Sequence, residues 1–476
     1  MAIKKLLGLF FGIALLCTFC PLSLGQGNPT KQPKAAAPQT SAVSPSPQSS
    51  SLNSADLNFS DRGLFVDIGI LRGLKKPAAA QPRSNASTSD SAFQKILVLA
   101  PQADPSSAGS LPVWTFRVRS PRDGNYYSGT MVGTNPFQSP GTVNVPTVVV
   151  PLVIRTKEIV TGFDPKTGIL STVPGDNTVD PTVPDNTCLS SPNNVPEILV
   201  QQSPIFTPTK FVLGGTNVGT TEYNDAFQRA TFWRAQEYGE DERNTYHVLL
   251  NPTFTAPVFL DVPDVYGVAL TDGLVLGPPA FCAPVTILDI NWFDTYLTGT
   301  VIPNLQSHGL VNPGTFPVFL VYNTVWASPA NNLYTCCVLG YHSITGFPLP
   351  TQTYSPSDFD TSGFFSDANG NPLPGFHDSA ILSHEVDEWM NDPYIVNPTP
   401  PWGHTGQVSG FCQANLEVGD PLTGTTLPPI VMPNGYTYNV QELAFFSWFF
   451  GGRSFGVNGW YSDNGTFTKD AGAPCH

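Results

Sequence analysis

One stretch of the chain, residues 378–393, constrains the fold most strongly because its pattern is that of a single amphipathic helix. Asp378 can cap the first helical turn by accepting a hydrogen bond from a backbone N–H. Pro393 cannot continue a helix and therefore marks its end. Between these two residues the apolar side chains recur at helical spacing: Ile381, Leu382, Val386, Trp389 and Met390. We expect this face of the helix to pack against a hydrophobic core.

The polar residues of the same helix have the spacing of a metal site. His384 and Glu388 are four residues apart and project from one side of a helix, and Glu385 follows His384 directly. This is the His-Glu-x-x-His zinc helix with a carboxylate in place of the second histidine. A catalytic zinc takes three protein ligands and keeps one position for water. We therefore predict that His384 and Glu388 bind metal and that Glu385 is the general base.

A third ligand must come from further along the chain, and the segment 415–421 offers the best candidate. We predict Glu417 as this ligand, with Asp420 as an acceptor that holds a ligand or a loop in place. His404 is the alternative third ligand, and His377 and Asp392 are weaker candidates.

The donor set bears on the metal and on its reactivity. Zinc is the expected ion because the spacing is that of the zinc helix. One imidazole and two carboxylates form a harder set than the usual two histidines, so Mn²⁺, Fe²⁺ or Ca²⁺ are the alternatives. Two carboxylates also neutralise the charge of a zinc ion and make its bound water less acidic. An inert or structural metal site is therefore the alternative to a catalytic one.

A longer run around this helix resembles a known group of proteins. It is similar to a run in secreted zincin-like proteins of largely unknown activity, and to the His-Glu-x-x-Glu segment of the plant phosphate-induced, EXORDIUM-like proteins, which carry a later Glu-x-x-Asp. The resemblance covers roughly residues 335–425 and implies a zincin-type site with three metal ligands and one base. The residues that carry it are Ser383–Glu388, Asn391–Pro393, Trp402 and Glu417–Asp420.

The N-terminal part of the chain has the features of an export signal and a linker. Residues 1–25 combine Lys4 and Lys5 with a short apolar run, as in a secretory signal peptide. Residues 26–91 are a low-complexity stretch that we expect to be disordered, apart from an apolar island at 65–74 that can dock on the folded part. We expect a secreted, extracellular or periplasmic protein that does not insert into a membrane once the signal is removed.

The cysteines agree with export. Removal of the signal leaves an even number of them, for which three disulfides are the expected state in an oxidising compartment. The six are Cys188, Cys282, Cys336, Cys337, Cys412 and Cys475. Because neighbours on a strand point to opposite faces, we predict that Cys336 and Cys337 bond to different partners.

The remaining pattern predicts an α+β protein. We expect a strand-rich portion at 92–220 and a zincin-like, metal-binding portion at 221–476. The two portions can form one continuous domain, with a mixed twisted sheet and an active-site helix. Predicted strands are Val113–Val118, Tyr126–Val132, Tyr246–Leu250, Val258–Val262, Phe316–Thr324 and Thr335–His342, and Val143–Arg155 is predicted as two short strands separated by its prolines. Predicted helices besides the metal helix are Thr221–Tyr238, Trp292–His308 and Asn439–Phe450. We interpret His342 as a structural histidine, with a place at the edge of the cleft as the alternative.

The composition restricts the partners. A net charge of −14 argues against nucleic acid, whose phosphates require a basic surface. The first hypothesis is a secreted metal-dependent hydrolase, most specifically a zinc metallopeptidase-like protein acting on a peptide or protein that lies along an edge strand. The second is a non-catalytic extracellular or cell-surface binding protein on a zincin scaffold. The sequence leaves the oligomeric state open.

Overall fold

The computed structural model describes residues 64–72, 109–235, 245–403 and 412–470. The predicted signal peptide at 1–25, most of the predicted linker at 26–91 and the alternative ligand His404 lie outside these residues. All four ranges belong to one compact unit, Ser54–His476.

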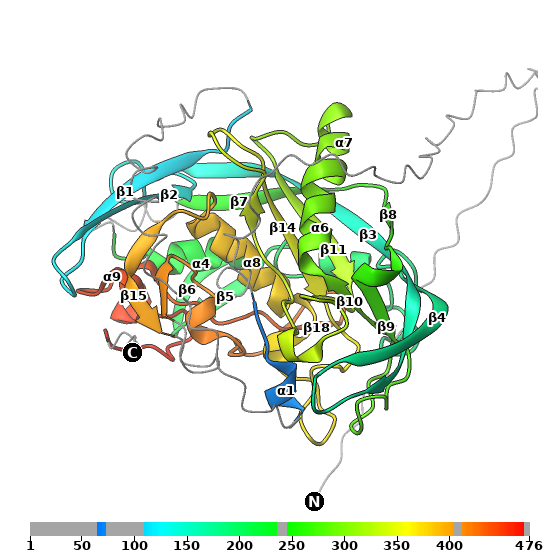
Figure 1. The fold of residues 1–476 in the computed structure, drawn as a ribbon. Coiled ribbons are helices and arrows are strands. Elements are labelled where there is room, and N and C mark those ends of the chain that lie inside the picture. The colour runs from blue at the N-terminus through cyan, green and yellow to red at the C-terminus, as the bar shows by residue number, and fades with distance from the viewer. Residues whose placement is uncertain (1–63, 73–108, 236–244, 404–411, 471–476) are drawn as a thin grey trace, which may run out of the picture. The chain divides into compact units, whose positions relative to one another are not determined.

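A ten-stranded mixed sheet organises this unit around one long strand, β3 (Figure 1). The strand path is β12-β10-β9-β3-β11-β14-β13, and β4, β7 and β8 also pair with β3. β3 pairs in parallel with β7, β8 and β11 and antiparallel with β4. The strands are β3 (Thr142–Phe163), β4 (Leu170–Val179), β7 (His247–Phe254), β8 (Val258–Asp261), β9 (Gly267–Leu270), β10 (Val285–Asp289), β11 (Phe316–Tyr322), β12 (Thr324–Ala327), β13 (Ser343–Ile344) and β14 (Thr353–Phe359).

Helices cover both faces of the sheet, and β11 shows how its side chains divide between them. Val318 and Leu320 belong to the apolar cluster that includes α4 (Tyr223–Thr231) and α8 (Ser379–Asn391). Phe319 and Val321 belong to the cluster that includes α6 (Ile290–Tyr296), a π-helical turn (Leu297–Val301) and α7 (Ile302–Ser307). This alternation is that of a strand buried on both faces, and it places α8 on the face opposite α6 and α7 (Figure 1).

Smaller elements complete the unit. Four two-stranded sheets pair antiparallel, and both strands of one of them, β1 and β2, were predicted from the sequence. Their strands are β1 (Val113–Arg119), β2 (Tyr126–Val132), β5 (Thr209–Leu213), β6 (Thr216–Thr221), β15 (Pro398–Gly403), β16 (Cys412–Asn415), β17 (Ile430–Val431) and β18 (Thr437–Tyr438). The short helices are α1 (Ile68–Leu71), α3 (Pro196–Gln201) and α9 (Phe446–Phe450).

The prediction that prolines divide Val143–Arg155 into two strands is wrong, because β3 runs unbroken through both. Pro146 pairs with Asn251 of β7 and lies one residue before pairing with β11 begins. Pro151 is the last residue paired with β11, and pairing with β8 begins at Leu152. Pro151 thus lies where the neighbouring strand changes, whereas Pro146 lies inside the ladder with β7 and just before the pairing with β11.

The helix predicted at 378–393 is confirmed as α8. Its N-cap is Asp378, whose carboxylate accepts a hydrogen bond from the backbone N–H of Ser379. Trp389 anchors it to the sheet, because its ring stacks on Phe316 of β11 with 3.5 Å between centroids, and its Nε1–H donates to Thr353 Oγ1 of β14 at 2.9 Å. The helix is therefore held against two adjacent strands along its apolar face.

Two other predicted elements are only partly present. Thr335–His342 is not a regular strand: a 3₁₀ turn (Leu333–Thr335) leads into an irregular segment that forms isolated bridges through Val338 and Gly340. Asn439–Phe450 is helical only over α9, and it ends at Gly451, whose φ of 77° lies in the left-handed region.

The apolar island at the N-terminal side docks on this unit. Leu64, Val66 and Ile68 are buried in a cluster that also contains Leu339 and, from α8, Ile381. Arg72 then donates hydrogen bonds to the carbonyl oxygens of Pro279 (2.9 Å) and Phe364 (2.7 Å).

The disulfides follow a different pattern from the one predicted. Cys336 and Cys337 are bonded to each other, so the prediction that they have different partners is wrong. The alternation argument does not apply because the pair lies in the irregular segment after the 3₁₀ turn rather than in a strand. Cys188 is bonded to Cys282, and Cys412 is also disulfide-bonded.

The class of fold is the predicted one at its coarser level: α+β, with a curled mixed sheet and few helices. Among the helices that the structure describes, none combines the length and apolar character needed to cross a bilayer.

Candidate metal centre

The predicted site residues of α8 lie inside the protein rather than on its surface, as does the rest of the helix. His384, Glu385 and Glu388 are all 0% exposed. Amphipathic packing alone does not explain this burial, because charged side chains are rarely buried fully unless they are paired or bind a metal.

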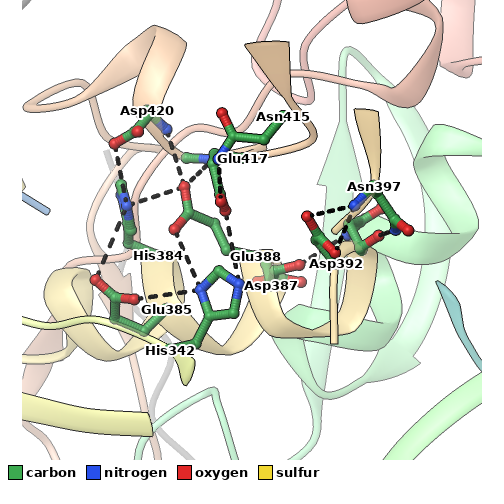
Figure 2. A network of polar contacts seen from close by, with 12 residues as sticks. His342, His384, Glu385, Asp387, Glu388, Asp392, Asn397, Asn415, Glu417 and Asp420 are labelled. Atoms are coloured by element: carbon green, nitrogen blue, oxygen red, sulfur yellow. Dashed lines mark hydrogen bonds and ion pairs between the residues drawn. The ribbon is translucent and has the colours of Figure 1, made fainter. Parts of the chain in front are cut away.

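Two segments outside α8 bring further ligand-type side chains to the helix (Figure 2). His342 comes from the irregular segment that precedes β13, and Glu417 and Asp420 come from the loop that follows β16. The helix itself positions that loop, because Glu388 Oε1 accepts hydrogen bonds from the backbone N–H groups of Gly419 (3.1 Å) and Asp420 (3.2 Å). His342, Glu417 and Asp420 are buried as completely as the residues of α8.

The first group of donor atoms combines His384, Glu388 and Asp420. His384 Nε2 lies 3.1 Å from Glu388 Oε1 and 3.6 Å from Asp420 Oδ1. These three residues offer donor atoms that all lie within 4.8 Å of one another, close enough for one cation to contact them together.

A hydrogen bond to Gln441 orients the imidazole of His384. Gln441 Nε2 donates to the carbonyl oxygen of Gly419 at 2.5 Å, so its Oε1 faces His384 Nδ1 at 3.0 Å. Nδ1 therefore carries the proton, and the lone pair of Nε2 points toward the carboxylates of Glu388 and Asp420. A histidine ligand is commonly held by such a contact at its second nitrogen.

The second group combines His342, Glu385 and Glu388. His342 Nδ1 lies 3.8 Å from Oε2 of Glu385 and 3.8 Å from Oε2 of Glu388, and its Nε2 lies 3.7 Å from Glu417 Oε2. Figure 2 shows this imidazole between the three carboxylates. The two groups share Glu388 but use different oxygens of it.

The electrostatics of the cluster fit a cation. Burial raises the pKa of Glu385 and of Glu388 well above the usual range, and the Asp420 carboxylate raises that of Glu388 further. In the part of the chain that the structure describes, Glu385 Oε2, Glu388 Oε2 and His384 Nε2 are buried without a hydrogen-bond partner. Four buried carboxylates around two imidazoles are costly unless protons or a metal ion neutralise them. The residues present therefore suit a divalent metal.

Two glycines make room for the cluster. A Cβ atom on Gly419 would lie 2.4 Å from His384 Nδ1, and a Cβ atom on Gly340 would lie 2.6 Å from Glu385 Cγ. Both distances are shorter than real contacts of a Cβ atom, so the backbone approaches the helix as closely as only glycine permits.

The predicted site residues are only partly brought together. His384 and Glu388 share a donor group as expected, but their third partner in that group is Asp420. Glu417 lies beside the other imidazole, that of His342, and accepts a hydrogen bond from Asn415 Nδ2 at 2.6 Å. Its role as a metal ligand stays a prediction.

The weaker candidates lie elsewhere or have other partners. Asp392 accepts backbone N–H bonds from Val396 and Asn397 just after α8, and His377 belongs to neither donor group. His342, interpreted from the sequence as structural, contributes to the second group. The only sequence signal for it was its place between the buried strand β11 and α8.

Comparisons with known proteins add no relative. No family model matches the chain, and neither the curated proteins nor the solved structures contain a match. The class that the structure defines is thus an α+β protein with a buried His/Glu/Asp cluster able to hold a metal ion.

Proposed function

We propose that this protein is an exported metal-dependent hydrolase and, more specifically, a peptidase. One observation carries the proposal: Glu385 lies beside the group formed by His384, Glu388 and Asp420 without belonging to it, with its Oε1 4.0 Å from His384 Nε2. A carboxylate next to a metal-binding group, but free of it, has the place of a general base.

Each residue then has a defined task. His384, Glu388 and Asp420 would hold the ion, and Glu417 is the alternative carboxylate from the same loop. The ion, when bound, would polarise a carbonyl group and make a water molecule acidic. Glu385 takes the proton of the attacking water and returns it to the leaving nitrogen. Gln441 keeps the lone pair of His384 directed at the metal position.

The donor chemistry supports zinc, with harder ions as alternatives. One imidazole and two carboxylates suit Zn²⁺ but equally accept Mn²⁺, Fe²⁺ or Ca²⁺. We propose zinc because the ligands lie in one helix plus a following loop, with the base adjacent to the first ligand, as in zinc hydrolases of the His-Glu-x-x-His type.

Export is the second part of the proposal. The apolar N-terminal run behind two lysines has the pattern of a secretory signal. The disulfides Cys188–Cys282 and Cys336–Cys337 support an oxidising compartment.

Burial supports a second candidate function. All the donor side chains are buried, and a structural metal site is closed whereas a catalytic one keeps a position open for water. A non-catalytic extracellular binding protein with an inert metal site is therefore the alternative.

Metal analysis combined with a Glu385→Gln variant separates the two. We expect the purified protein to carry a divalent metal, and Glu385→Gln to keep it while losing a chelator-sensitive cleavage of peptides. Glu158→Gln, on β3 and outside both donor groups, is the matched control. Metal retained by His384→Ala at the same affinity would contradict the site itself, and a metal-loaded protein that cleaves no peptide would favour the inert alternative.

A further inference from the structure

Residues 64–68 form a backbone ladder with the segment that leads to His342. Val66 and Cys337 exchange two hydrogen bonds, with Val66 N–H donating to Cys337 O at 2.8 Å and Cys337 N–H donating to Val66 O at 2.7 Å. Leu339 N–H donates to Leu64 O at 2.8 Å, and Phe65 pairs antiparallel with Val338. The segment 336–339 therefore has the backbone geometry that binds an extended peptide as an added strand.

This added strand ends on the proposed general base. The backbone N–H of Leu64 donates to Glu385 Oε1 at 3.0 Å. That oxygen is also the one that lies 4.0 Å from His384 Nε2. In peptide hydrolysis the base returns its proton to the nitrogen of the broken bond, so a substrate nitrogen must reach this same carboxylate. Leu64 thus holds its amide nitrogen where a leaving group would be.

The side chains of the strand alternate in their burial. Leu64, Val66 and Ile68 are buried against the core, whereas Phe65 and Asp67 are half-buried. Leu64, Val66 and Ile68 lie in the cluster with Phe281, Leu333 and Phe364. The edge therefore fits a peptide with apolar side chains at alternate positions, beginning with the residue whose nitrogen faces Glu385.

We propose that the segment 336–339 is the peptide-binding edge of the proposed hydrolase and that residues 64–68 are its intramolecular occupant. The proposal rests on the proposed function. The chain's own strand occupies the edge and engages the base through the N–H of Leu64, so that Glu385 is covered on this side. A substrate must displace this strand, and the preferred substrate is an extended peptide cleaved on the N-terminal side of a leucine-like residue that is followed by alternate apolar residues.

The test compares the intact protein with Val66→Asp, which places a charged side chain at a buried position of the strand. The probe is a fluorescent synthetic peptide with the sequence of residues 64–72, LFVDIGILR, and a scrambled peptide is the control. Val66→Asp should bind this peptide about tenfold or more tightly than the intact protein does, because apparent affinity scales with the fraction of open edge. The neighbouring substitution Asp67→Asn, at a half-buried position, should leave the edge closed. A folded Val66→Asp protein that binds the peptide no better than the intact protein overturns the proposal.

A second measurement needs no variant. In hydrogen exchange of the intact protein, the amides of Val66, Cys337 and Leu339 should exchange together and faster than those of Val318 and Leu320 in β11, because the strand opens without global unfolding. Equal protection of both sets would show that residues 64–68 are ordinary core, and it would end the proposal even if Val66→Asp failed to fold.

Failure of the proposed function looks different. Suppose that the double variant Val66→Asp/Glu385→Gln binds the peptide but the single variant Val66→Asp hydrolyses none. This result would support the peptide-binding edge and reject the hydrolase. Chelator-sensitive hydrolysis at equal rates in the intact protein and in Val66→Asp would keep the hydrolase and reject the occupant.

Discussion

His384 Nε2 lies 3.1 Å from Glu388 Oε1, one helical turn further along α8, yet no hydrogen bond joins the two atoms. Since Nδ1 of this histidine faces the amide oxygen of Gln441, the lone pair of Nε2 is directed at an oxygen that is also an acceptor. Two acceptors at this distance repel unless a cation or a proton lies between them. A proton or a metal ion between this pair of atoms would remove the repulsion, and the metal ion is the one that we propose.

Glu388→Gln should therefore separate metal binding from folding. We expect the affinity for metal to fall about 100-fold or more, the upper end of the loss seen when even an outer-shell partner is removed. The metal-free variant should be at least as stable as the metal-free parent, because an amide is cheaper to bury than a carboxylate and still accepts the N–H bonds of Gly419 and Asp420. Competition with a chelator and thermal unfolding with and without metal measure both quantities.

A buried carboxylate outside the donor groups provides the control for that experiment. Glu442 accepts hydrogen bonds from Ser462 and Thr466, and Glu442→Gln should leave the metal affinity unchanged. Parental affinity in Glu388→Gln would show that this residue only anchors the loop at Gly419.

Excess metal should inhibit the proposed hydrolase through the second donor group. An ion held by His342, Glu385 and Glu388 would occupy Oε2 of the base, and Glu385 could then no longer accept a proton. We expect His342→Gln to relieve inhibition by excess zinc while retaining the metal at His384. Cleavage rates measured against free zinc concentration, in both proteins, test this. Inhibition of equal strength in the variant would locate the second ion elsewhere.

Gly419→Ala should disturb the site without removing a ligand. The added methyl group would lie 2.4 Å from His384 Nδ1 and would displace the imidazole from Gln441. Overpacking of this kind costs about 1–3 kcal/mol, and the metal affinity should fall with it. Gly299→Ala is the matched control, because no atom lies within 4 Å of its added Cβ and the residue is part of a helical turn. Chemical denaturation and metal titration of the two variants give the comparison, and similar values for both would contradict the close approach at Gly419.

The parts of the site that the sequence could predict are those encoded locally. The spacing of His384, Glu385 and Glu388 follows from the period of one helix, and the Asp378 cap and Pro393 define its ends. His342 and Asp420 reach the helix through tertiary contacts. The loop of Asp420 docks because its backbone N–H binds Glu388, an interaction between residues far apart in sequence that no local pattern encodes.

The helix predicted over 439–445 does not form, and the reason is again a set of tertiary contacts that no local pattern encodes. Its aromatic and apolar spacing is helical, but its backbone donors are used by α8 instead. Asn439 N–H donates to Asp378 Oδ1 at 2.9 Å and Gln441 N–H donates to Ser383 Oγ at 2.9 Å. These bonds hold the segment extended and place Gln441 beside His384. Local propensity was overridden by the contacts that build the site.

The pH dependence of stability can be tested at a residue outside the metal cluster. Burial raises the pKa of Glu222 to about 8, and the nearby Asp225 carboxylate adds to the effect, while a hydrogen bond from Leu250 N–H opposes it. Between the ordinary glutamate pKa and about 8, the folded chain keeps a proton on Glu222 that the unfolded chain has released. The free energy of unfolding should therefore fall as the pH rises through this window, by at most about 1.4 kcal/mol per pH unit from this residue.

Glu222→Gln removes this titration and should make the free energy of unfolding depend less steeply on pH between 5 and 8. Asp360 and Asp378, whose pKa values burial raises to about 7, contribute equally to both proteins, so the difference between the two curves isolates Glu222. Asp272→Asn, at an exposed position, controls for the change in net charge. Guanidinium denaturation at several pH values gives the curves. Parallel curves for the parent and Glu222→Gln would mean that Glu222 is ionised in the folded protein at pH 7 and that its bond to Leu250 outweighs the cost of its burial.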